Sequence, residues 1–448
     1  MAPVRVIDVI HVAAPAAAAD APPPEPIKLN AMEAQWVLAP LLQHLLLFDS
    51  DQLPPFDAVV RSLRSSLAAT LMNSYAPLAG KLHYLADTGD VAIVGSSTDD
   101  DAVRFVVAET DADVRSLAGD EDHDVHTFEL LVPEVDMTLL PAPVLAVQAT
   151  RLGGGGVALG ITVHHGVADG RSLWRFVEAW AAACRGDTPP SPPVFDRSRV
   201  SLPGGEELAR RVLRKYAPDL PRVTMHAAVS LDRLRFTRRT FTLDAAHIAR
   251  LKQRAAGLGE AHGTPPSTFV AVVALAWTCF ARCRNIAADD EDVFLLFLAD
   301  ARGRLDPPAG AEYFGACLTV CLVSLPAREL HGEGALAAAA RAIQDAVQEM
   351  AADPLGCRPG WEFLKLGGDG AFRRDRAMTV SGAASFRVYD VADFGWGRPR
   401  RTENVRMNHD GQVALARARD GAGVQAAVSM LQRAHVDAFQ SELLELLG

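Results

Sequence analysis

Two apolar runs that lie close together most strongly constrain the fold of this chain. Residues 144–151 and 157–163 are rich in Val, Leu and Ile, and four consecutive glycines, 153–156, lie between them. Because glycine adopts positive φ without a clash at Cβ, the pattern predicts two neighbouring strands joined by a tight turn. A helical pattern begins soon after the second run, with its apolar residues on one face: Leu173, Phe176, Val177 and Trp180. The segment between the run and the helix is therefore a strand-to-helix loop.

The same alternation of strand and helix patterns continues through the chain. A helix is expected from Asp57, which we predict to be its N-cap, and it should end before Pro77 and Gly80. The other strands are predicted at 4–12, 235–243, 293–299 and 318–325, and the other helices at 267–281, 334–351, 434–447 and from Asp244 onward. This mixture, without an internal repeat, predicts the α/β class.

The length of the chain predicts more than one domain. A single hydrophobic core stops growing at roughly 250–300 residues, and this chain has 448. A Pro-rich stretch at 188–193 and the weak periodicity after it mark a change in character. We therefore expect an N-terminal domain over 1–190, a crossover linker over 191–225 and a C-terminal domain over 226–448.

Charge and composition disfavour several classes of partner. The net charge of −11 disfavours nucleic acid and anionic membranes, so an anionic co-substrate would need its own cationic pocket. No apolar run reaches ~18 residues and no signal-peptide pattern opens the chain, so we expect a cytoplasmic protein without a membrane segment. The cysteines lack the spacing and the His partners of a zinc site, so no metal is predicted. They are expected as reduced core thiols: Cys184, Cys279, Cys283, Cys317, Cys321 and Cys357.

The loop after the second apolar run carries the candidate chemistry, because it reads His-His-Gly-Val-Ala-Asp-Gly over 164–170. The imidazole of His165 can accept a proton near neutral pH, which a hydroxyl must lose to attack a thioester. Adjacent residues at a strand end point to opposite faces, so His164 is expected to be structural. For a lone His, satisfying a buried backbone group is the plainer interpretation. The whole string favours the functional one, chiefly because of what it resembles.

That string resembles the signature of the BAHD acyltransferases, a His, three variable residues, Asp and Gly, which condensation domains and chloramphenicol-type acetyltransferases share. Residues 393–397, Asp-Phe-Gly-Trp-Gly, are identical to the family's second motif, and 75–82 and 300–305 resemble two further landmarks in the same order. The resemblance covers essentially the whole chain. It implies two chloramphenicol-acetyltransferase-like domains, each a mixed β-sheet flanked by helices, with the active-site channel between them.

The resemblance also implies a reaction. Acyl-CoA would be the co-substrate, with no bound cofactor, and His165 would be the general base for direct transfer to a hydroxyl without an acyl-enzyme. The absence of a Gly-x-Ser-x-Gly nucleophile motif fits that route. Asp169 would pair with Arg302 and support the loop, so it would not be the acid of a hydrolase-like triad.

The second motif is implied to stabilise the fold. In that role Asp393 is ion-paired and Trp396 is packed, with Gly395 and Gly397 shaping the loop, while a contact with CoA is the alternative. A donor to the oxyanion is also needed, because charge develops on the thioester oxygen. Ser381 resembles a Ser/Thr position that serves this purpose in some relatives, and an ordinary loop serine is an equal alternative.

The segment Tyr-Phe-Gly-Ala-Cys at 313–317 indicates the substrate. It resembles the Tyr-Phe-Gly-Asn-Cys motif of the branch that acylates anthocyanins, flavonoids and other phenolic glucosides, often from malonyl-CoA. The alanine in this chain cannot make the hydrogen bonds of that Asn. A guanidinium would suit a malonyl carboxylate, and an aromatic residue would suit the acceptor, with solvated surface and core packing as the plainer alternatives. The candidates are Trp36, Arg171, Arg175, Tyr313 and Ala316.

Other functions stay open at this point. A hydroxycinnamoyl-CoA transferase acting on a hydroxyl or an amine would use the same base. A catalytically inactive relative that only binds its ligands is disfavoured, because both motifs are intact. A condensation enzyme that takes its acyl group from a carrier protein is disfavoured because the second motif is not expected there. The expected partners are small molecules, and the expected state is a monomer.

Overall fold

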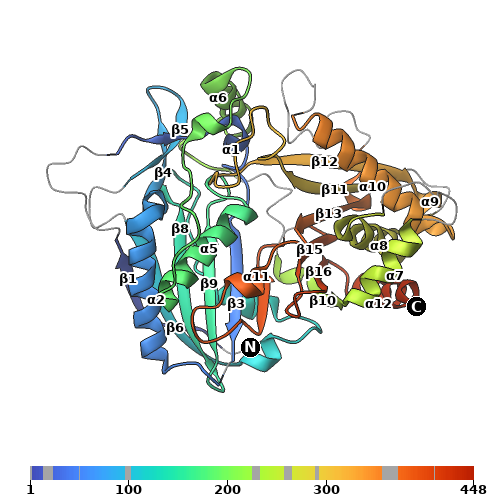
Figure 1. Ribbon diagram of the computed structural model, residues 1–448, viewed down its shortest axis with the longest axis horizontal. Coiled ribbons are helices and arrows are strands. Elements are labelled where there is room, and N and C mark those ends of the chain that lie inside the picture. Colours follow the sequence, from blue (N-terminus) through green and yellow to red (C-terminus); the bar gives the residue numbers. More distant parts are fainter. Residues whose placement is uncertain are drawn as a thin grey trace.

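The computed structural model describes residues 3–13, 24–49, 51–95, 102–224, 233–256, 265–287, 292–355, 372–407 and 409–448. In this part of the chain, two six-stranded sheets lie side by side, and a four-stranded sheet adjoins the first (Figure 1). Both large sheets are mixed, because each combines antiparallel with parallel pairs. The predicted α/β class, with two mixed sheets flanked by helices, is confirmed.

The first large sheet has helices on both faces. Along its strand Leu42–Phe48, Leu46 and Phe48 join one apolar cluster, while Leu45 and Leu47 join another, as the two-residue period of a strand requires. The long helices α2 and α5 cover the first face. The short helices α3 and α4 cover the second face. In sheet order the strands are β1 (Arg5–Val12), β6 (Val103–Asp113), β8 (Leu145–Gly153), β9 (Val157–Val163), β3 (Leu42–Phe48) and β14 (Arg401–Asn404). The helices are α2 (Phe56–Thr70), α5 (Gly170–Arg185), α3 (Val114–Leu117) and α4 (Val125–Leu130).

The second large sheet carries its helices on the side away from the first (Figure 1). The helix α8 is buried along almost its whole length, because it lies against the sheet and is flanked by the other helices. In sheet order the strands are β10 (Thr237–Leu243), β16 (Val424–Met430), β15 (Gln412–Arg417), β13 (Ala377–Gly382), β11 (Asp292–Asp300) and β12 (Leu318–Pro326). The helices are α7 (Ala245–Ala255), α8 (Thr268–Cys283), α9 (Ala327–His331), α10 (Ala335–Ala352) and α12 (Arg433–Leu447).

The small sheet lies beside the segment expected as a linker. Its strands, in order, are β2 (Ile27–Lys28), β5 (Asp90–Val94), β4 (Lys81–Leu85) and β7 (Ala142–Pro143). The helix α6 (Gly205–Tyr216) contacts β5 and the short helix α1 (Ala31–Ala34). The expected crossover over 191–225 is therefore not a plain connection: it contains a helix whose apolar face joins the first core.

One strand of the first sheet comes from the far end of the chain. After the short helix α11 (Val388–Val391), β14 pairs antiparallel with β3, so that Arg401 lies opposite Leu47 and Asn404 opposite His44. The motif loop at 393–397 leads into this strand. The stretch expected as the C-terminal domain thus lends a loop and an edge strand to the N-terminal sheet, and the predicted domain boundaries do not include this exchange.

Local predictions had mixed outcomes. Asp244 is the N-cap of α7, and Gly154 and Gly155 have positive φ in the turn between β8 and β9, as predicted. The prediction that Asp57 is an N-cap was wrong: α2 begins at Phe56, and Pro55 occupies the cap position.

The cysteines of the described part are all free thiols: Cys184, Cys279, Cys283, Cys317 and Cys321. Of these, Cys184 is only half-buried and the others are buried. Cys357 lies outside the described residues. Among the helices of the described ranges, none is both long and apolar enough to cross a membrane.

Candidate active site

The His-containing string forms a tight turn between β9 and α5. The N–H groups of Val167 and Ala168 both donate to the carbonyl oxygen of His164, which closes the turn directly after the strand. The carboxylate of Asp169 then accepts from the N–H of Ser172 at 2.9 Å and caps α5. The strand end and the helix start therefore fix the backbone of His165 from both sides.

His164 has the structural role that its position predicts. Its side chain is completely buried, and Nδ1 accepts a hydrogen bond from the N–H of Gly166 at 3.1 Å. Burial lowers the pKa of His164 to about 4, and the neighbouring His165 acts in the same direction. The ring is therefore neutral near pH 7 and holds the turn together.

His165 has a different environment. Its ring stacks on the ring of Trp36, with the centroids 4.4 Å apart and an interplanar angle of 10°. The residue is 8% exposed, and Nδ1 is buried without a hydrogen-bond partner among the described residues. Burial lowers the pKa of His165, while backbone groups of His165 and Ala168 and the carboxylate of Asp169 oppose that shift. The neutral imidazole that a general base needs is thus favoured near pH 7.

The expected ion pair between Asp169 and Arg302 is present and completely enclosed. Arg302 Nη1 lies 2.7 Å from Asp169 Oδ2, and Arg302 Nη2 lies 3.1 Å from Asp169 Oδ1. The N–H of Cys317 also donates to Oδ2, so both carboxylate oxygens are fully occupied. Burial alone would raise the pKa of Asp169, but the guanidinium and the backbone donors outweigh it and hold the pKa below its usual value. Since none of these donors is His165, Asp169 does not orient the candidate base.

A second buried ion pair lies next to the first. Glu33, at the end of the Asn30 capping box on α1, lies 2.9 Å from Arg197 and accepts from the hydroxyl of Tyr313 at 3.0 Å. The guanidinium groups of Arg197 and Arg302 each lie 5.7 Å from the centroid of the Tyr313 ring. Burial is the largest influence on the carboxyl of Glu33 and raises its pKa despite the nearby guanidinium. We call the residues Asp169, Arg302, Tyr313, Glu33 and Arg197 the near junction.

Sequence reasoning missed Glu33 and Arg197, although one signal was available. The spacing Asn30-x-x-Glu33 is a capping-box pattern, and it marks the start of α1. Gly315 shows how tightly the near junction is built, because a Cβ there would lie 2.2 Å from Glu33 Oε1. The glycine of the Tyr-Phe-Gly segment is therefore required by packing.

The other candidate substrate residues have partners within the protein. Arg171 pairs with Asp300 at 2.9 Å, and Arg175 donates to the backbone and hydroxyl oxygens of Ser191. Tyr313 and Ala316 are buried, which favours a structural role for both over a direct contact with substrate.

Ser381 lies on β13 in the second sheet. Its hydroxyl accepts a hydrogen bond from Gln412 Nε2 at 3.4 Å, and no hydrogen bond joins it to His165. Among the described residues, the candidate oxyanion donor is thus not hydrogen-bonded to the candidate base.

The second motif lies at the opposite end of the first sheet from His165. Phe394 and Trp396 are buried, and both rings contact the ring of Phe48. Phe48 pairs with the first residue of β9, whereas His165 lies just after the last residue of that strand. The strand between these ends is about 20 Å long. The expected ion pair of Asp393 is not found among the described residues. Its carboxylate accepts instead from the N–H groups of Gly395 and Gly397 at 2.9 and 3.1 Å.

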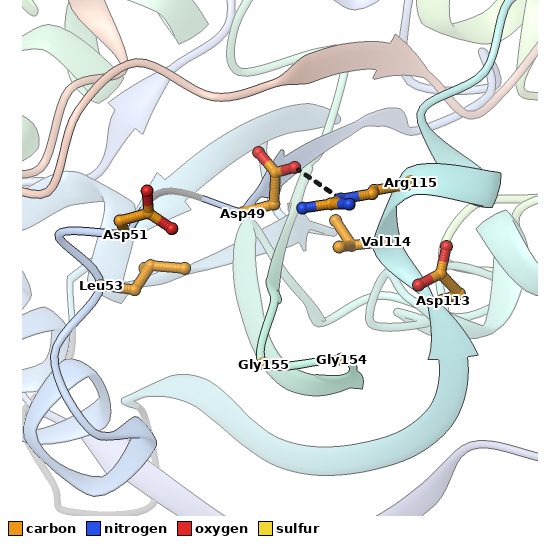
Figure 2. A pocket seen from close by; sticks show the side chains of 8 residues that line it. All are labelled: Asp49, Asp51, Leu53, Asp113, Val114, Arg115, Gly154 and Gly155. Atoms are coloured by element: carbon orange, nitrogen blue, oxygen red, sulfur yellow. Dashed lines mark ion pairs between the residues drawn. The ribbon is translucent and has the colours of Figure 1, made fainter.

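The cavity in Figure 2 is also remote from His165. Its volume is about 440 Å³, and it lies at the turn between β8 and β9, the end of the sheet opposite the candidate base. Three carboxylates and one guanidinium line it, and Arg115 pairs with Asp49 at 3.8 Å. An acidic lining disfavours phosphate, so this cavity does not match the charge of a CoA thioester.

Comparisons with known proteins identify the family. Residues 18–446 match the Transferase family. The chain is 31% identical to phenolic glucoside malonyltransferase 1 of Bemisia tabaci over 99% of this chain and 96% of that protein. It is 30% identical to agmatine coumaroyltransferase of Arabidopsis thaliana over 78% of each chain. The crystal structure of vinorine synthase shares the fold, with a TM-score of 0.70 and 19% identity over 99% of this chain and 98% of that one. The chain therefore belongs to the transferase family of the BAHD enzymes, which are acyl-CoA-dependent acyltransferases.

Proposed function

We propose that this acyltransferase moves a malonyl group from malonyl-CoA to a hydroxyl of a phenolic or flavonoid glucoside, with His165 as the general base. One observation carries the catalytic part. His165 is a slightly exposed imidazole with a lowered pKa at the end of β9, on a turn fixed by His164 and Asp169. The name of the malonyltransferase relative supports the donor and the acceptor.

The proposed reaction needs no acyl-enzyme. Because Nδ1 of His165 is buried, Nε2 is the nitrogen that takes the hydroxyl proton. The oxygen attacks the thioester carbon, the carbon–sulfur bond of the tetrahedral intermediate breaks, and the proton passes from Nε2 to the leaving sulfur. The products are the malonyl ester and free CoA thiol, so atoms and charge balance.

Arg171 is the candidate for binding the malonyl carboxylate. It follows Gly170 at the start of α5, and its side chain is about half exposed. Its present partner, Asp300, is itself partly exposed and also pairs with Arg302. Exchange of one carboxylate partner for another costs little at an exposed site, so malonate can take the place of Asp300.

A second candidate function is transfer of a hydroxycinnamoyl group to an amine. The relative named agmatine coumaroyltransferase supports it at nearly the same identity. The base would be the same, because an amine also loses a proton during acyl transfer.

Thiol release distinguishes these functions. The purified protein is incubated with malonyl-CoA, acetyl-CoA or coumaroyl-CoA and with a panel of phenolic glucosides or agmatine. We expect release with malonyl-CoA and a glucoside, and its loss in His165→Ala but not in His247→Ala, a control histidine on α7. We expect Arg171→Ala to raise KM for malonyl-CoA about 10- to 100-fold and to leave acetyl-CoA unaffected.

The other outcomes have clear meanings. Release only with coumaroyl-CoA and agmatine would establish the second function. Full activity of His165→Ala would overturn the general-base mechanism. No release with any pair, from folded protein, would favour a relative that binds ligands without turnover.

A further inference from the structure

We infer that Trp36 is a positioning residue for the reaction: its indole holds the plane of the His165 ring and stabilises the positive charge that His165 acquires with the acceptor proton. This inference rests on the proposed role of His165. It gives Trp36 a function that depends on its contact with the base and not on contact with the acceptor.

The need for such a residue follows from the near junction. In serine hydrolases a carboxylate bonds to Nδ1 of the catalytic imidazole, fixes the ring and stabilises the imidazolium. Here the carboxylate of the nearest candidate, Asp169, accepts its hydrogen bonds from Arg302, Ser172 and Cys317. Nδ1 of His165 has no partner among the described residues. No carboxylate in the described part of the chain therefore fixes the ring, and the indole stacked on it can take over that part.

Trp36 has the geometry for both tasks. The two rings are almost parallel at a centroid separation of 4.4 Å, so the indole covers one face of the imidazole. Rotation about χ2 of His165 would drive the imidazole edge into the indole. The face of an indole also attracts a cation, most strongly away from water. Trp36 can thus lower the energy of the imidazolium that forms when the hydroxyl loses its proton.

Other residues hold Trp36 in turn. The backbone N–H of Trp36 donates to the carbonyl oxygen of Glu33 at 2.9 Å, so the turn that carries the indole continues directly from α1. Glu33 is tied to Arg197 and Tyr313, and Asn30 donates to the Tyr313 hydroxyl at 2.8 Å. The near junction therefore fixes both partners of the stack: Asp169 anchors the His165 turn, and Glu33 anchors the Trp36 turn.

Among the described residues, few titratable groups bear on His165. His164 is its neighbour in the chain, and Asp169 lies on the same turn. Across the turn, Glu33 presents a backbone carbonyl towards Gly166 and directs its carboxylate to Arg197. From the second half of the chain, Arg302 is directed onto Asp169. Replacing Trp36 alters none of these charged side chains.

The test compares Trp36→Leu with Trp36→Phe in the full-length protein, using the donor and acceptor that give thiol release. Leu keeps the site apolar but removes the aromatic face, whereas Phe keeps an aromatic face. We expect Trp36→Leu to lower kcat about 10- to 100-fold. We also expect the acid limb of the kcat/KM profile to move down by about 0.5 to 1 pH unit, because the imidazolium loses its aromatic partner. Trp36→Phe should stay within a few-fold of the wild type and keep the acid limb.

A matched control exists in the same core. Trp174 meets His44 edge-to-face at 5.1 Å, so Trp174→Leu removes a tryptophan beside a histidine that is not the proposed base. That variant should keep the acid limb of the wild type.

Two results would overturn the inference. A Trp36→Leu protein with normal kcat and acid limb but a raised KM for the acceptor would make Trp36 a substrate contact. Equal loss in Trp36→Leu and Trp36→Phe would show that the aromatic face does not matter. If His165→Ala is active, the proposed function itself has failed, so the two failures are distinguishable.

Discussion

The two halves of the chain meet at two buried ionic clusters that are built differently. In the near junction, Arg302 donates to Asp169, Asp300, Ser172 and two backbone carbonyls, so its donors have acceptors. The far junction contains Arg401, Glu403, Asp120, Arg238 and His123. There, neither ring nitrogen of His123 has a hydrogen-bond partner among the described residues, and Glu403 Oε1 is 3.7 Å from His123 Nδ1.

Backbone pairing adds to side-chain pairing at the far junction. The N–H of His123 donates to the carbonyl of Arg238, and the N–H of Thr240 donates to the carbonyl of Asp120. Arg238 also donates to the carbonyls of Asn404 and Val405. The far junction is therefore held by backbone pairs together with the ion pairs of Arg401 with Asp120 and Glu403, whereas the near junction is held mainly by side chains. The difference teaches that the buried charges beside the candidate base, Asp169 and Arg302, are more completely paired than His123 at the far junction.

The two junctions should differ most in the free energy of unfolding that is lost when the arginine of each is replaced. Arg302→Met leaves Asp169 buried without its cation, which should lower the free energy of unfolding by about 3–5 kcal/mol. Arg401→Met should cost less, because Asp120 is exposed and His123 can take a proton beside Glu403. Urea unfolding at pH 7.5 measures both. The double variant Asp169→Asn with Arg302→Met should recover part of the stability that Arg302→Met loses. Equal losses in Arg302→Met and Arg401→Met would refute the comparison.

Acid should lower the free energy of unfolding more through His164, beside the candidate base, than through His123 at the far junction. The folded pKa of His164 is about 4, below the unfolded value of 6.5, so the stability linked to its neutral form is complete above pH 6.5. It is lost as pH falls from 6.5 towards 4, by roughly 3 kcal/mol at most. Burial, Arg401 and Arg238 also lower the pKa of His123, and Glu403 opposes them, so stability there is lost in the same direction as pH falls. We expect the smaller loss there because the Glu403 carboxylate lies 3.7 Å from the His123 ring and can pair with its protonated form.

The free energy of unfolding at pH 7.5, 6 and 5 tests this difference. His164→Asn keeps an acceptor for the Gly166 N–H and should flatten the pH dependence more than His123→Asn does. A steeper dependence in His164→Asn than in the wild type would contradict the assigned direction.

The smallest effect is expected in the motif loop that leads to the far junction. Asp393→Ala removes the acceptor of two backbone N–H groups at a partly exposed site, which should cost about 1 kcal/mol. Because the loop lies at the opposite end of the first sheet from His165, kcat should stay unchanged. Thermal unfolding and the thiol-release rate measure the two quantities, and a large fall in kcat at normal stability would place the loop in the catalytic machinery.

Continuous apolar patterns made the main strands and helices predictable. The runs that became β8, β9, β11 and β12 are long and rich in Val and Leu, and Asp244 precedes its helix as an N-cap should. In contrast, β14 reads Arg-Thr-Glu-Asn, which no hydrophobic period marks. It is a strand because the edge of β3 supplies its hydrogen-bond partners and because its charged side chains find partners at the far junction.

The candidate site was predictable only in part, for a similar reason. The motif and its resemblance pointed to His165, Asp169 and Arg302, and the ion pair between the last two is present. The stack of Trp36 on His165 joins residues 129 positions apart, and no local pattern reports such a contact. The engagement of Tyr313 by Glu33 and Arg197 likewise depends on three separate segments, which explains why the sequence indicated a substrate contact there instead.

The pairing of β14 with β3 also sets an order for biosynthesis. A ribosome releases β3 early, but the strand that closes this edge emerges only when the chain is almost complete. Until then the nascent N-terminal half presents an open row of backbone donors and acceptors, the kind of edge that recruits chaperones or other chains. The two halves are consequently poor candidates for separate expression, because the first is unfinished without the second.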